Sequence, residues 1–214
     1  MSAPERLVQD AATLGVALSE GDARRLLALL DELTRWNRTY NLTAINTPAA
    51  MLTHHLLDSL AIHSDLQGTR IADVGTGAGF PGLPLAVCNP ARHFTLIDST
   101  AKKIRFVSHA AQALGLTNVT AVHARAESLR PEAPFDTVVA RALAPLPQLL
   151  AQVAPLCGAK SRVLAMKGRW PREELASLPA PWRLAGSREL KVPGLAAARC
   201  VIVLASASGP PPCP

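Results

Sequence analysis

The segment from Arg70 to Gly82, with the sequence RIADVGTGAGFPG, limits the possible folds of this chain more than any other stretch. A short apolar run ends at Asp73-Val74, four glycines follow within eight positions, and the helix-like sequence LPLAV comes next. A strand, a glycine-rich turn and a helix in this order present backbone N–H groups to a nucleotide-like ligand in open α/β sheets. Glycine suits such a turn because it adopts positive φ and lets the ligand approach the backbone. The segment therefore predicts a nucleotide-binding turn in an α/β protein.

Strands and helices are predicted to alternate from Gly68 onward. The predicted strands are 70–74, 93–97, 119–123, 137–140, 162–166, 182–192 and 200–205, and the predicted helices are 83–88, 101–114, 146–157 and 172–178. Repeated β-then-α units predict a doubly wound, mostly parallel seven-stranded sheet. The last two strands are joined around Pro193-Gly194 with no helix between them, which predicts an antiparallel pair at one edge.

The residues before this sheet are predicted to be helical. Ser19 begins one helix, with Asp22 three positions later, and Thr47-Pro48 begins a second. We therefore expect residues 1–66 to form a helical cap on a core of residues 67–206. The proline-rich residues 207–214 are expected to be a disordered tail.

Composition restricts the class of protein. With 49% hydrophobic and 18% charged residues, the composition is typical of a globular protein. The sequence has no uncharged apolar run of 18 residues and no leader-like segment, so we expect no membrane span and no secretory signal. Four scattered cysteines without C-x-x-C spacing favour reduced thiols in a cytoplasmic protein, with no metal. The net charge of +6 suits a phosphate-bearing partner, while 4% aromatic residues argue against an extended base-stacking surface.

The glycine-rich turn is compatible with two cofactors, NAD and S-adenosylmethionine. Residues 77–82 match the dinucleotide pattern G-x-G-x-x-G, but the predicted strand already ends at Val74, and Pro81 lacks the N–H that a pyrophosphate would use. Asp73 would repel a pyrophosphate and suits a ligand with a cationic sulfur and an ammonium group. The turn therefore favours S-adenosylmethionine, and an NAD-dependent oxidoreductase with a Rossmann-type core is the alternative.

Two further acidic residues are candidates for the nucleoside end of this ligand. Asp98 ends the second predicted strand, 23 residues after Gly75, where it would accept hydrogen bonds from ribose hydroxyls or, alternatively, cap the next helix. Ala126-Glu127 follows the third predicted strand, where a backbone N–H and a carboxylate could meet an adenine edge. The alternative for Glu127 is a solvated surface acid.

The end of the fourth predicted strand bears on the methyl acceptor. It reads VARALAP, without the Asp/Asn-Pro-Pro-aromatic segment that serves exocyclic amino groups, and no cysteine is placed as a nucleophile for carbon methylation. A ring nitrogen with its own lone pair, such as guanine N7, needs neither device. Catalysis of that transfer would consist mostly of alignment and electrostatic positioning.

A set of motifs in one order resembles the small-subunit ribosomal RNA methyltransferase G family, also called glucose-inhibited division protein B. The motifs are Trp36-Asn37-x-x-x-Asn41-Leu42-Thr43, His55-x-x-Asp58-Ser59, the segment from Asp73 to Gly82, Arg141-Ala142 and Lys167-Gly168. The resemblance covers nearly the whole chain up to the tail. It implies the class I methyltransferase fold and methyl transfer from S-adenosylmethionine to N7 of one guanine in 16S ribosomal RNA of the small subunit. We expect the protein to act as a monomer and away from membranes.

The resemblance also implies roles for particular residues. Matching positions place Gly75, Gly77, Phe80, Ala126 and Glu127 at the cofactor. Arg141 enters the site as the catalytic residue and as a further cofactor contact, and Asp73 and Asp98 join the cofactor residues on the reasoning above. Arg141 would clamp a carboxylate or phosphate or donate to guanine O6, with a strand-end salt bridge as its alternative.

Four residues are candidates for RNA contacts: Asn41, His55, Lys167 and Arg169. Asn41 could instead cap a helix C-terminus, and His55 could pair with Asp58 one helical turn away. One position departs from the family pattern, because His54 stands where a lysine or arginine is usual. A mostly neutral imidazole there would weaken a phosphate contact.

Overall fold

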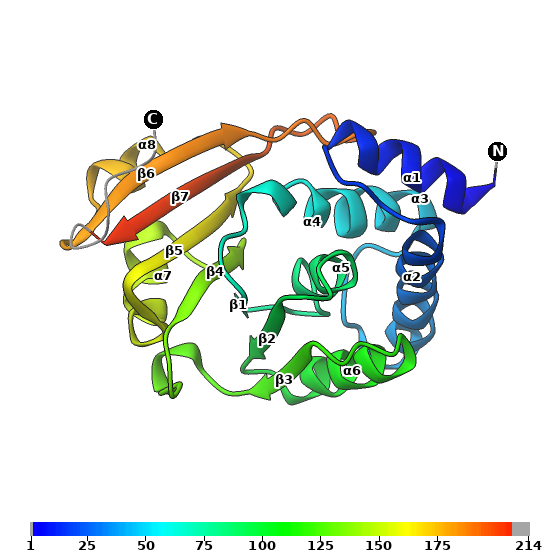
Figure 1. Ribbon diagram of the computed structural model, residues 1–214, viewed down its shortest axis with the longest axis horizontal. Helices are drawn as coiled ribbons and strands as arrows, with labels where there is room; N and C mark the ends of the chain where they lie inside the picture. Colours follow the sequence, from blue (N-terminus) through cyan, green and yellow to red (C-terminus); the bar gives the residue numbers. More distant parts are fainter. Residues whose placement is uncertain (1, 207–214) are drawn as a thin grey trace.

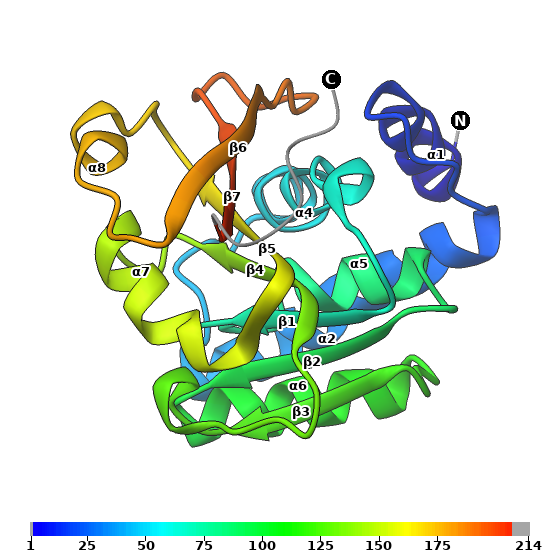
Figure 2. The same cartoon turned by 60° about the vertical axis from the view of Figure 1, so that its left-hand side comes forward.

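The computed structural model describes residues 2–206 (Figure 1). Its seven-stranded sheet is built from β1 (Arg70–Val74), β2 (His93–Asp98), β3 (Val119–His123), β4 (Phe135–Arg141), β5 (Cys157–Lys167), β6 (Trp182–Glu189) and β7 (Cys200–Ser206). The strand order is β3-β2-β1-β4-β5-β7-β6, which Figure 2 shows from β3 at the bottom to β6 at the top. The predicted α/β architecture with a mostly parallel sheet is confirmed.

Strand β1 is the point at which the winding of the sheet reverses. It pairs in parallel with β2 on one side and with β4 on the other, and the next strands extend outward from each neighbour. In open α/β sheets a ligand-binding crevice forms at such a switch point, outside the carboxyl ends of the strands.

The last two strands form the antiparallel edge that the sequence predicts. Strand β7 lies between β5 and β6 and is antiparallel to both, so the chain passes the neighbouring position, forms β6 at the edge and then returns. The connection from residue 190 to 199 contains Gly194 with a φ of 74°. This return places Arg199, just before β7, next to the carboxyl end of β5.

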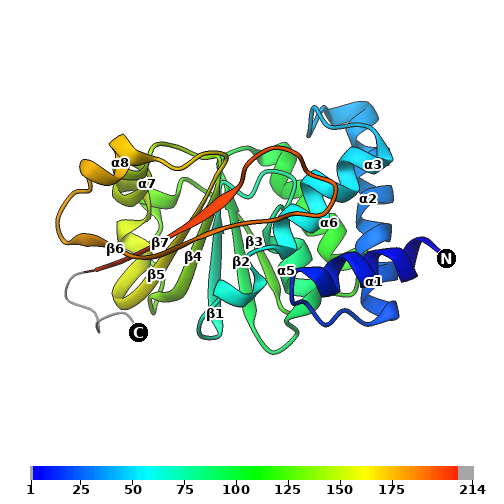
Figure 3. The same cartoon turned by 90° about the horizontal axis from the view of Figure 1, so that it is seen from above.

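Helices cover both faces of the sheet, as Figure 3 shows from above. The helices after β1 are α5 (Gly82–Cys88), α6 (Ala101–Ala113), α7 (Leu146–Val153) and α8 (Arg172–Ala176), with short 3-10 helices η3 (Ala126–Ser128) and η4 (Ala154–Leu156). Alternate strand residues enter different cores: Ile71 and Val139 pack with α5 and α6, while Ala72 and Val138 pack with α7. Strands buried on both faces explain the nearly continuous apolar runs in β1 and β4.

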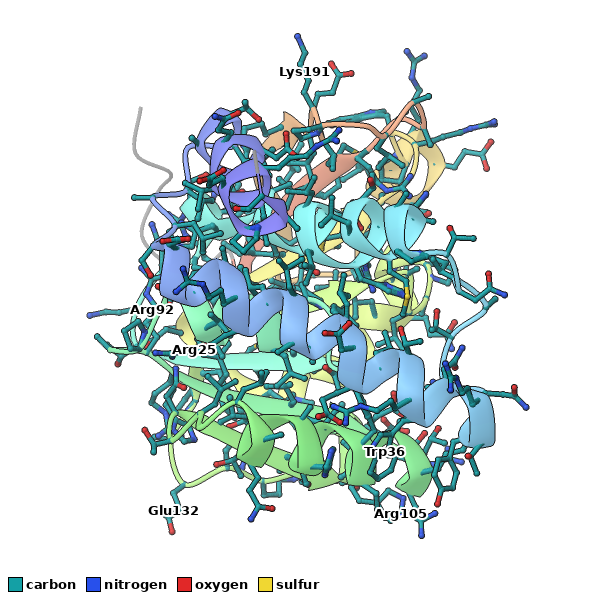
Figure 4. All side chains as sticks on the ribbon, turned by 90° about the vertical axis from the view of Figure 1, so that its right-hand side faces the viewer. Arg25, Trp36, Arg92, Arg105, Glu132 and Lys191 are labelled. Atoms are coloured by element: carbon teal, nitrogen blue, oxygen red, sulfur yellow. The ribbon has the colours of Figure 1, made fainter. Side chains whose placement is uncertain are left out.

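The N-terminal part is helical as predicted. It contains α1 (Ala3–Thr13), α2 (Glu20–Tyr40), α3 (Pro48–Met51), a π-helical segment η1 (Leu52–Leu57), α4 (Asp58–Leu60) and a 3-10 helix η2 (His63–Asp65). Ser19 caps α2 by accepting a hydrogen bond from the Asp22 N–H, and Thr47 caps α3 by accepting one from Ala50. Figure 4 shows Trp36 pointing from α2 toward α6.

These helices share one hydrophobic core with the sheet. Leu26 of α2 and Leu56 of η1 are fully buried in the same cluster as Ile71 of β1. The predicted boundary at residue 66 falls between η2 and β1, and the division into a cap and a core stays a prediction. The predicted tail, residues 207–214, lies outside the described residues.

Candidate active site

Two adjoining cavities open at the carboxyl ends of the parallel strands. The first, of about 440 Å³, lies toward η1 and the loop between α2 and α3, and the second, of about 460 Å³, lies over the ends of β2 and β3. Gly75, Arg141 and Ala142 line both cavities. The two spaces therefore meet at the switch point between β1 and β4, where α/β sheets bind ligands.

The glycine-rich turn forms the floor where the cavities meet. Gly75 and Gly77 have φ values of 68° and 62°, in the left-handed region that favours glycine. The Gly75 N–H donates to the Ile97 carbonyl at 2.8 Å, and the Gly77 N–H donates to Asp98 Oδ2 at 3.0 Å. A Cβ atom added to Gly77 would meet no atom within 4 Å, so this position opens onto free space. Backbone without side chains at the cavity wall is the surface a nucleoside ligand requires.

Asp73 lies beneath the turn, and not on the wall of either cavity. Only 1% of the residue is exposed, and its Oδ2 accepts hydrogen bonds from the Thr76 hydroxyl at 2.6 Å and the Gly82 N–H at 2.8 Å. Burial raises the pKa of this carboxyl to about 6, against the lowering effects of both hydrogen bonds. Asp73 holds the turn in shape through these two hydrogen bonds, and its contact with the cofactor stays a prediction. Its Oδ1 has no hydrogen-bond partner within residues 2–206, which leaves negative potential directly under the site.

The second cavity brings together the residues predicted for the nucleoside. Asp98, Ala126 and Glu127 all line it. Asp98 is 7% exposed and also accepts a hydrogen bond on Oδ1 from the Thr100 N–H at 2.8 Å. Thr100 is the N-cap of α6, and this helix has no side-chain cap, so Asp98 does not take the alternative capping role. The side chain of Glu127 is 45% exposed at the rim, with Arg125 Nη1 3.9 Å from its Oε1.

Arg141 ends β4 and is held by η1 and α4. Its Nη1 donates to the His54 carbonyl at 2.8 Å and to Asp58 Oδ2 at 3.1 Å. The other oxygen of Asp58 accepts from Arg199 Nε at 3.2 Å. Because Asp58 is 3% exposed and bridges two guanidinium groups, the cluster has an excess positive charge at the first cavity.

The roles of Asp58 and Arg199 were not predicted. The sequence pairs Asp58 only with His55, whereas the arginines that bind it in the structure lie 83 and 141 residues away along the chain. The available signal was a carboxylate within the mostly apolar segment 56–62, where a buried charge requires a cationic partner.

The predicted RNA-binding residue His55 belongs to a network that explains the Trp36–Thr43 motif. Asn37 binds the backbone of Thr43 twice, through Oδ1 at 2.9 Å and Nδ2 at 3.0 Å. The Thr43 hydroxyl lies 3.2 Å from His55 Nε2, and the imidazole stacks on Phe80 with ring centroids 4.6 Å apart. Desolvation, followed by the charge of Arg141, lowers the pKa of His55 to about 4, so the ring is neutral.

The other three predicted RNA-binding residues occupy different environments. Asn41 is the exposed C-cap of α2 with a φ of 48°, which is its alternative role, and it lines neither cavity. Lys167 lines the first cavity, but its ammonium donates to Glu174 Oε2 at 2.8 Å and to the Ala144 carbonyl at 3.0 Å, so its charge is largely compensated. Arg169 is exposed beyond the rim. Their RNA contacts stay predictions.

Residues 2–206 contain neither a metal-binding cluster nor a membrane-spanning helix. No group of three or more histidine, cysteine, aspartate or glutamate side chains is placed to hold a metal ion in this part of the chain. None of the described helices is both long and apolar enough to cross a membrane.

The fold is that of class I S-adenosylmethionine-dependent methyltransferases. A methyltransferase of that type from Thiobacillus denitrificans, in complex with S-adenosyl-L-homocysteine, superposes with a TM-score of 0.54 at 13% identity, covering 70% of this chain and 90% of that one. Another from Aquifex aeolicus gives a TM-score of 0.56 at 18% identity, covering 77% and 97%.

Sequence comparison identifies the family. The model of the family described as rRNA small subunit methyltransferase G matches residues 22–202. Relatives named ribosomal RNA small subunit methyltransferase G from Nitrosococcus oceani and Alkalilimnicola ehrlichii are 47% and 50% identical over 191 and 186 residues, covering 89% and 87% of this chain and 89% and 84% of theirs. The chain belongs to this family and is an rRNA methyltransferase whose cofactor is S-adenosylmethionine. The NAD-dependent alternative is not supported.

Proposed function

We propose that this protein transfers the methyl group of S-adenosylmethionine to N7 of one guanine in 16S ribosomal RNA of the small subunit. The proposal includes action as a monomer in the cytoplasm. The observation that carries it is the meeting of two cavities at Gly75, Arg141 and Ala142, because methyl transfer needs a donor site and an acceptor site that share one wall.

The second cavity and the turn would hold the cofactor. Asp98 would bind the ribose hydroxyls and Ala126-Glu127 the adenine edge. Gly75, where the cavities meet, and Gly77 and Phe80, on the adjoining wall of the first cavity, would contact the remainder of the cofactor. When bound, S-adenosylmethionine supplies a methyl group activated by its cationic sulfur. The unpartnered Oδ1 of Asp73 beneath the turn fits a cationic ligand through its potential.

The first cavity would hold the guanine. Its wall contains the neutral imidazole of His55, the compensated Lys167 and the Arg141–Asp58–Arg199 cluster. N7 carries a lone pair and no proton, so the acceptor needs no general base, in agreement with the low pKa of His55. Arg141 would orient the base by donating to O6 and would do so from a position fixed by Asp58.

The test is methylation of small ribosomal subunits taken from cells that lack this protein. Subunits are incubated with the protein and methyl-labelled S-adenosylmethionine, and the RNA is digested and mapped. We expect one N7-methylguanine at a single position of 16S RNA. A label on an exocyclic amino group or a ring carbon would contradict the proposed acceptor.

Ligand binding tests the cofactor separately. S-adenosyl-L-homocysteine should raise the melting temperature of the protein, whereas NADH should not. Stabilisation by NADH alone would exclude the proposal.

A further inference from the structure

A third, smaller cavity adjoins the first one at its outer rim. It has a volume of about 280 Å³, and its lining includes Arg169, Trp170 and Glu189. It shares Gly168 and Arg199 with the first cavity. Trp170 is 46% exposed, which is unusual for so large an apolar side chain beside a functional cleft.

We propose that Trp170 is a stacking surface for one unpaired base of the substrate RNA, next to the target guanine. This inference rests on the proposed function and adds a specific RNA-binding residue to it. A guanine that enters the first cavity must leave its stack, and its neighbour in the strand then needs a new partner. The indole of Trp170, at the adjoining cavity, offers an aromatic face at that place.

The charges around Trp170 favour RNA as the occupant. Arg169 is exposed and forms no ion pair with any carboxylate in the described part of the chain, and Arg199 contributes a second guanidinium shared with the Asp58 bridge. Glu189 is the carboxylate that lines this cavity, against two arginines. An aromatic face beside excess positive charge is the combination that binds single-stranded nucleic acid.

The backbone that carries Trp170 is held at both ends. On one side Lys167 is tied to Ala144 and Glu174, and on the other side the Trp170 carbonyl accepts a hydrogen bond from the Arg172 N–H at 3.1 Å. Between them, a Cβ added to Gly168 would meet only Arg199 Nη1, at 3.9 Å. The segment that carries Trp170 is therefore anchored, and the space beside Gly168 is open. Stacking of a single base needs only one aromatic residue, so the proposal agrees with the aromatic content of 4%.

The test compares Trp170→Ala with Trp170→Phe, which keeps an aromatic face. Leu184→Ala is the matched control, because Leu184 is 40% exposed on β6 and lines none of the three cavities. We expect Trp170→Ala to raise the KM for small ribosomal subunits about fivefold or more, the loss typical of one stacked base. Trp170→Phe should recover most of this loss. The affinity for S-adenosyl-L-homocysteine should be unchanged in all three variants.

An unchanged KM in Trp170→Ala would overturn the inference, as would an equal loss in Trp170→Phe. Failure of the wild-type protein to methylate the subunits would instead contradict the proposed function. Titration with a single-stranded RNA oligonucleotide separates RNA from ribosomal protein as the partner. We expect stronger quenching of tryptophan fluorescence in the wild type than in Trp170→Phe, and equal quenching would overturn an RNA contact.

Discussion

At the scale of single residues, one buried carboxylate holds two arginines that come from distant parts of the chain. Asp58 binds Arg141 through Oδ2 and Arg199 through Oδ1. A buried charge destabilises a protein unless it is paired, so the two arginines together compensate the desolvation of the Asp58 carboxylate. The bridge fixes the position of Arg141 at the common wall of the two larger cavities while part of its guanidinium remains available, since its side chain is 22% exposed.

Arg141→Ala is expected to abolish methyl transfer to small ribosomal subunits while the fold is retained. Loss of a positioned electrostatic donor costs about 100-fold or more in rate. Asp58 keeps its pairing with Arg199, so the circular dichroism spectrum should not change. Arg188→Ala is the control, because Arg188 lines neither of the two larger cavities and its Nη2 lies 2.6 Å from Asp65 Oδ2. Loss of this surface pair should leave the activity intact. Full activity of Arg141→Ala would remove this residue from the site.

His55 should make the protein less stable as the pH falls. Its pKa is lowered from 6.5 to about 4 in the folded state, so the unfolded chain binds the proton more readily. The contribution of the neutral ring is complete above pH 6.5 and is lost as the pH falls toward 4. Asp73, whose pKa is raised to about 6, acts in the opposite direction over the acidic part of this range.

His55→Gln isolates this effect, because the other titrations cancel between variant and wild type. The free energy of unfolding of the wild type should fall by about 2 kcal/mol relative to the variant between pH 7 and pH 5. Urea unfolding at both pH values measures it. A difference that does not vary with pH would mean that His55 is protonated equally well in the folded state.

At the scale of elements, different glycines of the turn between β1 and α5 serve different purposes. Gly82 allows close packing, and Gly77 leaves space for a ligand. A Cβ at Gly82 would lie 2.7 Å from Asp73 Oδ2 and 2.8 Å from Leu96 Cγ, both in buried residues, whereas a Cβ at Gly77 would meet nothing within 4 Å. Gly82→Ala should therefore destabilise the protein by about 2 kcal/mol through overpacking.

Gly77→Ala should lower the free energy of unfolding by only about 1 kcal/mol, which is the cost of the left-handed backbone alone. Its melting temperature should therefore fall less than that of Gly82→Ala. Gly77→Ala should nevertheless weaken the thermal shift caused by S-adenosyl-L-homocysteine more than Gly82→Ala does, because its methyl group would project into the cavity. Thermal melts of both variants with and without this ligand provide the measurement. The reverse ranking of melting temperatures would contradict the assigned packing.

Local patterns predicted the elements well and the side-chain partnerships poorly. The bounds of β1 and β3 match the sequence-based prediction residue for residue, because short apolar strands are delimited by polar and glycine-rich segments. The π-helical segment η1 was not predicted, since nothing in its composition distinguishes it from an α-helix. The burial of Asp73 and the partners of Lys167 depend on how the turn and α8 pack, which no local pattern contains.

At the scale of the whole molecule, the net charge of +6 predicts different salt responses for the two substrates. Binding of RNA releases counterions and weakens steeply with salt, while binding of a small ligand that carries no phosphate depends on salt much less. Between about 50 and 200 mM salt the KM for small subunits should rise at least tenfold. The thermal shift with S-adenosyl-L-homocysteine should change little. Equal responses would indicate that the positive charge does not face the RNA.

The common wall of the two larger cavities has a thermodynamic consequence. Because Arg141 and Ala142 belong to both, a ligand in one cavity alters the surface offered to a ligand in the other. We expect cooperative binding, in which S-adenosyl-L-homocysteine changes the affinity for the ribosomal subunit and the subunit changes the affinity for S-adenosyl-L-homocysteine by the same factor. Such reciprocity would make the affinity of the enzyme for the ribosomal subunit depend on whether a ligand occupies the cofactor site.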